Sequence, residues 1–277
     1  MSAGGVRHIV SKKILFCNCE GEIITSERLQ SIKAHLKQVK ADVIFVSDLC
    51  RLSVTGGDEL TVFFNEEHEY LIIGCFSRTM KLLFDGFLVN SEKASITYLN
   101  FLESDNGGLF YAIDNFCANS QQQNTINEFI TPKEWPSWYP IIDYSRCTAC
   151  GQCADFCLFC VYEKNEKRVS VVNPQGCKNN CPACARICPH TAIIFPKYKH
   201  GGAISGSAEI DEMAEQKRQA MDIESILGND IYSALEQRKL KRHSIVRNDV
   251  MKKAMEERDK ALKENGKLAP KSPAGGL

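Results

Sequence analysis

The distribution of cysteine constrains this chain more than any other feature. Fourteen of the 277 residues are cysteine, and eight of them fall in two runs within one segment. The runs are Cys147-Cys150-Cys153-Cys157 and Cys177-Cys181-Cys184-Cys188, and Pro189 follows the second run directly. Intervals of two or three residues hold several thiols in one tight loop, where they can surround a metal centre. The segment is therefore expected to fold around two cysteine loops.

The segment resembles the two-cluster ferredoxins. Its first run has the two, two and three intervening residues of the bacterial 4Fe-4S run, and its second has three, two and three and ends in Cys-Pro. In these ferredoxins the fourth cysteine of each run ligates the other cluster. Two interlocked 4Fe-4S clusters are thus expected. Their predicted ligands are Cys147, Cys150, Cys153 and Cys188 for the first cluster, and Cys157, Cys177, Cys181 and Cys184 for the second.

Zinc and disulfides are the alternatives for these cysteines. A structural zinc site takes four ligands, typically in two pairs, which would leave the third and fourth cysteine of each run without a role. Disulfides need an oxidising compartment, and residues 1–10 lack the apolar core of an export signal. No stretch reaches the ~20 apolar residues of a membrane span. We expect a cytoplasmic protein with reduced thiols.

Composition and residue pattern divide the chain into four parts. We predict an α/β domain over 1–118, a polar linker over 119–134, a dicluster ferredoxin domain over 135–206, and a charged helical tail over 207–277 with a disordered end. The 34 basic and 34 acidic residues leave no net charge. Because phosphate neutralisation dominates nucleic-acid binding, the composition gives that function no support.

Apolar runs predict the fold class of each domain. In the first domain, runs at 13–16, 43–46, 70–74 and 96–102 suit buried strands, and helical periodicity follows Thr25 and Arg78. This pattern indicates a small three-layer α/β domain with a mostly parallel sheet. In the second domain, short apolar strands flank both cysteine loops, as in the α+β ferredoxin pseudo-repeat.

The first domain carries its own cysteines at the ends of predicted strands. Cys17 and Cys19 follow the first strand, Cys50 follows the second, and Cys75 ends the third. Because parallel strands end at one edge of a sheet, these four thiols could hold a third 4Fe-4S cluster. The alternative is that they fill the core, as free cysteines often do.

A second resemblance favours the third cluster. Cys17-Asn18-Cys19, the lone Cys50 and the run Ile72 to Arg78 are similar to the N-terminal domain of the A subunit of heterodisulfide reductase, over about Lys13 to Glu103. In that family the domain is associated with an iron-sulfur cluster. Phe76-Ser77 replaces the family's Ser-Pro, and residues 55–67 form an insertion. The resemblance implies redox protein partners, such as heterodisulfide-reductase-like or flavoprotein subunits.

The remaining features concern the tail and two spare cysteines. Apolar residues at helical spacing between Met221 and Leu235 predict helices that either wrap this chain's own domains or dock on a partner. Cys160 is expected to be a small buried residue, and Cys117 has no obvious partner.

These patterns support three hypotheses about function. The first is an electron-transfer protein or subunit with two or three 4Fe-4S clusters, which does no bond-making itself. The second is an iron-sulfur sensor or scaffold that signals cluster state through its tail. The third is a redox enzyme subunit whose N-terminal cluster contacts substrate. Because the sequence has no Ser/His/Asp grouping, P-loop or dinucleotide-binding glycine loop, catalysis by the chain alone is not expected.

Overall fold

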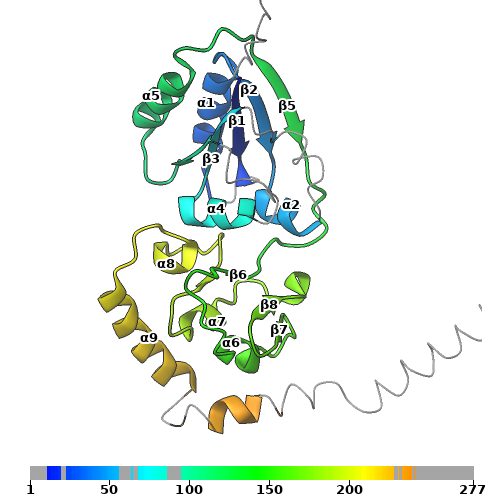
Figure 1. Cartoon of the computed structure of the whole chain (residues 1–277), viewed down its shortest axis with the longest axis vertical. Helices are drawn as coiled ribbons and strands as arrows, with labels where there is room; N and C mark the ends of the chain where they lie inside the picture. Colours follow the sequence, from blue (N-terminus) through cyan, green and yellow to red (C-terminus); the bar gives the residue numbers. More distant parts are fainter. Residues whose placement is uncertain are drawn as a thin grey trace, which may run out of the picture.

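The first domain is built on a parallel five-stranded sheet. The computed structural model describes residues 11–19, 23–55, 64, 68–85, 95–227, 230, 233–238 and 240. The strand order is β4-β3-β1-β2-β5, and every neighbouring pair is parallel (Figure 1). The strands are β1 (Lys12–Cys17), β2 (Asp42–Val46), β3 (Glu69–Gly74), β4 (Ser95–Asn100) and β5 (Thr125–Phe129). This confirms the predicted α/β class with a parallel sheet.

Two helices cover one face of this sheet, and two shorter helices cover the other. On the first face, α1 (Ser26–Leu36) and α5 (Asn106–Cys117) pack on alternate residues of the strands, among them Ile14 and Phe16. On the second face, α2 (Leu49–Thr55) and α4 (Ser77–Asp85) pack on the intervening residues, among them Leu15. Alternate side chains of a strand point to opposite faces, so near-continuous apolar runs supply both cores. The result is the predicted three-layer arrangement.

Strand β5 lies where the sequence analysis placed a linker. Residues 125–129 pair with β2 at the edge of the sheet, so the sheet continues past residue 118. Four of the five β5 residues are exposed, so the strand has no hydrophobic pattern and could not be recognised by one. Main-chain pairing holds it instead, supported by the amide of Asn124, which donates to the carbonyls of Leu36 and Val39.

The ferredoxin-type domain lies against the carboxyl ends of the sheet strands, below α2 and α4 in Figure 1. Strand β6 (Ile141–Ile142) pairs with β9 (Ile193–Ile194), and β7 (Tyr162–Lys164) pairs with β8 (Val169–Val171); both pairs are antiparallel. Each cysteine loop leads into a short helix, α6 (Gln152–Phe156) or α7 (Ala183–Arg186), and the 3-10 turn η3 (Pro174–Gly176) precedes the second loop. The short strands lie where the apolar runs predicted them.

The described part of the tail packs on the ferredoxin-type domain. After α8 (Gly202–Ser205), helix α9 (Glu212–Leu227) runs along that domain (Figure 1). The Gln219 amide donates to the Thr191 hydroxyl at 2.8 Å, and farther on Leu235 packs on the cluster of Phe156 and Ile187. This arrangement matches the first alternative for the tail, in which it wraps the chain's own domain. The side chains from 241 onward, with the predicted disordered end, lie outside the described residues.

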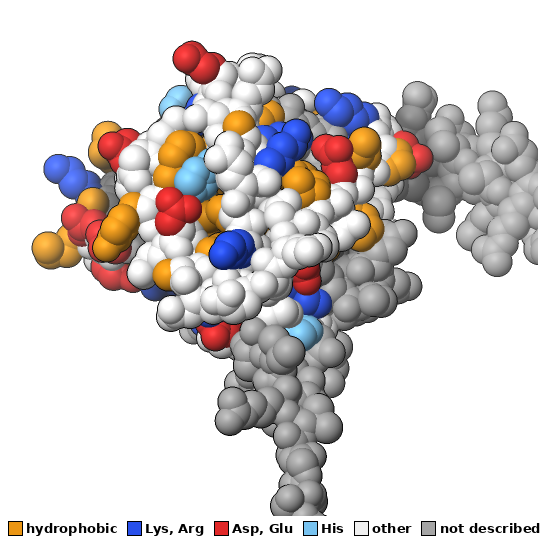
Figure 2. All heavy atoms as spheres, turned by 90° about the horizontal axis from the view of Figure 1, so that it is seen from above, with side chains coloured by type: hydrophobic (Ala, Val, Ile, Leu, Met, Phe, Trp, Pro, Cys, Tyr) orange, Lys and Arg blue, Asp and Glu red, His pale blue; other side chains and the backbone are white. Residues whose placement is uncertain are grey.

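Neither the surface charge nor the helices of the described residues single out a special environment for the protein. Acidic and basic side chains are interspersed on the face shown in Figure 2, and no charge of one sign dominates it. None of the helices in the described ranges is long and apolar enough to cross a bilayer.

Candidate metal centres

Four thiols of the α/β domain line one cavity at the carboxyl edge of the sheet. Cys17 ends β1, Cys19 follows it with a left-handed φ of 50°, Cys50 lies in α2, and Cys75 follows β3. The cavity is otherwise closed by apolar side chains, namely Leu49, Met80, Leu83 and Pro196. The four predicted residues therefore converge, although Cys17 and Cys75 are 58 positions apart in the sequence.

The lining of this cavity suits thiolate ligands of a metal cluster. The amide of Leu49 donates to the Cys17 sulfur at 3.4 Å, a contact that would stabilise a thiolate. Burial raises the pKa of Cys17 to about 11, and burial together with the nearby Cys17 raises the pKa of Cys75 to about 12. These thiols therefore hold their protons at neutral pH in the absence of metal. A cluster would replace those protons and remove the repulsion between thiolates.

The first cysteine run shares its cavity with the last cysteine of the second run. The lining thiols of this cavity are Cys147, Cys150, Cys153 and Cys188. Burial, followed by the proximity of Cys188 and Cys150, raises the pKa of Cys153 to about 12. The amide of Ala192 donates to the Cys188 sulfur at 3.4 Å. Cys188 thus sits with the opposite run, in the crossed grouping that the ferredoxin pattern predicts.

The second run shares its cavity with the last cysteine of the first. The lining thiols here are Cys157, Cys177, Cys181 and Cys184. Burial and the neighbouring Cys157 raise the pKa of Cys177 to about 12. The additional residue between Cys177 and Cys181 is taken up by a turn, in which the Cys181 amide donates to the Lys178 carbonyl and Asn180 adopts a φ of 57°.

Single-ion sites are a separate question from these cavities. Among the described residues, no three Cys, His, Asp or Glu side chains form a group that could hold one metal ion. A lone zinc ion needs every sulfur about 2.3 Å from one centre. A four-iron cluster instead takes one thiolate at each iron, so its ligands surround a cavity.

The two spare cysteines lie apart from the three cavities. Cys160 is exposed and adopts a φ of 53°, so the expectation of a buried residue is wrong: its turn between α6 and β7 directs it outward. Cys117 is buried at the end of α5, in the apolar core between the sheet and helices α1 and α5. We predict that Cys160→Ser and Cys117→Ser each leave the iron content of anaerobically purified protein unchanged. Loss of iron in either variant would mean that its thiol exchanges with a ligand set.

Two consecutive aromatic residues join the N-terminal cavity to the second-run cavity. The Trp138 indole donates to the Cys181 carbonyl at 3.3 Å, and the Tyr139 hydroxyl donates to the Cys50 carbonyl at 2.6 Å. Cys177 also packs against the apolar cluster that contains Cys17 and Cys50. One short segment therefore touches both sites. The sequence carries no signal for these two contacts, because each joins segments that are far apart in the chain.

Tyr162 joins the two cavities of the ferredoxin-type domain. Its hydroxyl donates to the Cys184 sulfur at 3.1 Å. Burial, then the proximity of Cys184 and Cys153, raises the pKa of this phenol well above its ordinary value. Tyr162 thus remains a neutral hydrogen-bond donor close to thiols of both sets.

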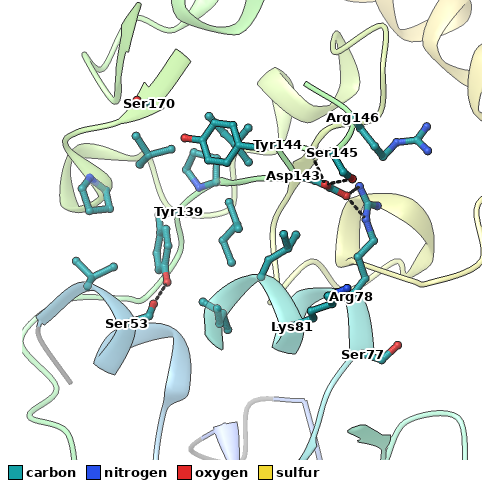
Figure 3. Close-up of a pocket in the computed structure, with 18 of the residues that line it drawn as sticks. Ser53, Ser77, Arg78, Lys81, Tyr139, Asp143, Tyr144, Ser145, Arg146 and Ser170 are labelled. Carbon is teal, nitrogen blue, oxygen red and sulfur yellow. Dashed lines mark hydrogen bonds and ion pairs between the residues drawn. The ribbon is translucent and has the colours of Figure 1, made fainter. Parts of the chain in front are cut away.

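A groove of about 1200 Å³ opens where the two domains meet (Figure 3). Arg78 of α4 crosses it to pair with Asp143 at 2.7 Å, and Tyr139 reaches Ser53 of α2 at 2.5 Å. Burial acts against ionisation of Asp143, but the Ser145 hydroxyl and Arg78 hold its pKa below the usual value. The groove shares one lining residue with each cysteine cavity; these residues are Leu83, Pro140 and Ile142.

Comparison with known proteins agrees with the ferredoxin part of this description. The family described as "4Fe-4S binding domain" matches residues 140–157, which include the whole first run. The chain contains a 4Fe-4S ferredoxin-type domain. An uncharacterized ferredoxin of Methanocaldococcus jannaschii is 47% identical over 64 residues, which are 23% of this chain and 44% of that protein. This chain thus aligns with less than half the length of the relative. No solved structure matches the chain.

Proposed function

We propose that the chain is an iron-sulfur electron carrier with three 4Fe-4S clusters, one in each four-cysteine cavity. The observation that carries the proposal is the convergence of twelve cysteines, from three separate parts of the sequence, into three sets of four. A bound 4Fe-4S cluster supplies reversible one-electron transfer, and its potential depends on hydrogen bonds to sulfur and on burial. The chain's own residues supply both: amide and phenol donors reach sulfur, and apolar side chains close the cavities.

The three sites follow one another in a fixed order. Trp138 and Tyr139 link the N-terminal site to the second-run site, and Tyr162 links the second-run site to the first-run site. The first-run site ends the series with Cys150, an exposed residue. This order supports a relay in which the second-run site is central and the first-run site meets one redox partner. We propose that the partner belongs to a heterodisulfide-reductase-like complex.

Four thiols per site also bear on catalysis. Where every iron of a cluster has a protein ligand, no coordination position stays open for substrate. Within the described residues, the Asp143 carboxylate of the groove is already engaged by the Arg78 guanidinium and the Ser145 hydroxyl. The arrangement favours a carrier over an enzyme.

Iron analysis of two proteins tests the proposal. Anaerobically purified full-length protein should contain about twelve irons and twelve labile sulfides per chain. The variant with Cys17, Cys19, Cys50 and Cys75 all replaced by serine should contain about eight of each, because the ferredoxin-type domain keeps both of its ligand sets. Eight irons in both proteins would return the four N-terminal thiols to the role of core residues. It would leave the two-cluster carrier intact.

One observation favours a second function, a sensor that reports cluster state through the tail. Arg238 lines the second-run cavity and lies over the Phe156 ring at 4.1 Å. Loss of the cluster from that cavity would therefore change the surroundings of Arg238, a residue of the tail. Limited proteolysis of the tail with and without iron distinguishes the two functions. A carrier should show the same tail cleavage sites in both forms, whereas a sensor should release the tail when the second-run cluster is absent.

A further inference from the structure

The phenol of Tyr162 makes a buried hydrogen bond to a cysteine sulfur of the second-run cavity. Its hydroxyl donates to the Cys184 Sγ at 3.1 Å, and both residues line this cavity. Only 8% of Tyr162 and 7% of Cys184 are exposed, so bulk water does not compete for either group. The ring packs in the apolar core of the ferredoxin-type domain, which holds the hydroxyl in place. Tyr162 is therefore a fixed side-chain donor to one predicted ligand of this site.

The two halves of the ferredoxin-type domain follow the same course after each cysteine run. Cys160 and Thr191 each lie three residues after the last cysteine of a run, and both have left-handed φ angles, 53° and 49°. Strands β7 and β9 begin two residues farther on, at Tyr162 and Ile193. Tyr162 lines the second-run cavity, and Ile193 lines the first-run cavity. These two residues therefore occupy equivalent positions in an internal repeat.

The chemistry of this position differs between the two sites. The Ile193 side chain is buried and has no hydrogen-bonding group, so the fold needs only an apolar residue there. Tyr162 adds a hydroxyl at the equivalent place, and a buried hydroxyl is costly unless it is hydrogen-bonded. The Cys184 sulfur supplies that partner. Packing alone does not explain the phenol, and its effect is on the sulfur that it contacts.

A hydrogen bond to a ligand sulfur changes the reduction potential of an iron-sulfur cluster. Reduction adds one electron, and part of the added negative charge lies on sulfur. Because hydrogen bonds strengthen as the acceptor becomes more negative, a donor at sulfur stabilises the reduced state more than the oxidised state. The phenol of Tyr162 keeps its proton, so reduction adds an electron and moves no proton at this contact.

We propose that Tyr162 is a positioning residue of the second-run site, where its hydrogen bond to Cys184 raises the reduction potential of the cluster. Ile193 cannot make this contact at the first-run site, so the internal repeat treats its two clusters unequally at this position. The inference rests on the proposed function, since it requires the second-run cluster. In the proposed relay, the central site is then the one whose reduced form Tyr162 stabilises.

Redox titration of anaerobically purified full-length protein, followed by electron paramagnetic resonance, tests the inference. Tyr162→Phe keeps the ring and removes only the hydroxyl, so it should hold as much iron as the wild type. At a fixed potential, the ratio of reduced to oxidised second-run cluster should fall about tenfold, a shift of about 59 mV to lower potential for a one-electron couple. The first-run cluster should not shift. The second-run signal is the one that Cys181→Ala lacks.

Two further proteins distinguish an effect at sulfur from a change in the fold. Tyr144→Phe is the matched control, because the Tyr144 hydroxyl of the same domain donates to the Val169 carbonyl at 3.2 Å and not to sulfur. It should leave the second-run potential unchanged. A 3-fluorotyrosine at position 162 is a stronger hydrogen-bond donor of nearly the same size. It should shift the second-run potential above the wild-type value.

The outcomes separate this inference from the proposed function. A Tyr162→Phe protein with all its irons and an unshifted second-run potential overturns the role of Tyr162 while the electron carrier stands. If Tyr162→Phe loses the second-run irons, the fluorotyrosine protein decides: a raised potential supports the role, and an unchanged one overturns it. An equal shift of both clusters, or the same shift in Tyr144→Phe, also overturns it. Wild-type protein without a second-run cluster refutes the proposed function, and this inference with it.

Discussion

Replacing Cys188 with alanine should damage the cluster of the first run and spare that of the second. Although Cys188 belongs to the second run in sequence, its side chain lines the cavity of Cys147, Cys150 and Cys153. It is nearly buried there and is held by the Ala192 amide, so no solvent or neighbouring thiol takes its place readily. Without this ligand, one iron loses its thiolate, and the cluster should be lost or reduced to a three-iron form.

Two reference variants identify which cluster the Cys188→Ala protein has lost. Cys150→Ala defines the spectrum of protein that lacks an intact first-run cluster, and Cys181→Ala does the same for the second run. The electron paramagnetic resonance spectrum of reduced Cys188→Ala should match that of Cys150→Ala. The reciprocal variant, Cys157→Ala, should match Cys181→Ala. A Cys188→Ala spectrum that matches Cys181→Ala would show that each run holds its own cluster and would refute the crossed grouping.

Local spacing made the cysteine sites predictable from the sequence. Cys147, Cys150 and Cys153 lie so close in the chain that the loop itself brings them together. Cys17, Cys50 and Cys75 lie far apart, but each follows a strand of a parallel sheet, and such strands end at one edge. Their convergence could therefore be expected once the apolar runs had been interpreted as strands.

Features that depend on long-range pairing could not be predicted in this way. The contact of Lys197 with Asp48 joins residues of two domains, and neither residue has a distinctive neighbourhood in the sequence. Strand β5 exposes four of its five residues and has no alternating apolar pattern, because an edge strand can be held by main-chain hydrogen bonds alone. The hydrogen bonds of Trp138 and Tyr139 depend on how the domains dock. In each case the missing information is the relative placement of two separate segments.

A charge placed at Leu235 should destabilise the second-run cluster, which would show that the tail is part of the ferredoxin-type fold. Leu235 packs on Phe156 and Ile187, and Ile187 is completely buried. Phe156 ends α6 and directly precedes Cys157, and Ile187 follows α7 and directly precedes Cys188. Leu235→Asp would force this contact open and re-expose part of both side chains, at a cost of about 2 to 4 kcal/mol. The opening would admit chelator to the cavity that Arg238 also lines.

The measurement is the rate of iron release to a chelator, together with the midpoint of thermal unfolding. Leu240→Asp is the matched control, because Leu240 is 64% exposed and its replacement buries no charge. We expect Leu235→Asp to release iron several-fold faster and to unfold at a lower temperature, while Leu240→Asp behaves as the wild type. Deletion of residues 241–277, which removes none of these contacts, should also leave iron release unchanged. If Leu235→Asp keeps its iron as firmly as Leu240→Asp, the tail contributes nothing to the cluster site, and the apolar face of 221–235 becomes the candidate surface for a redox partner.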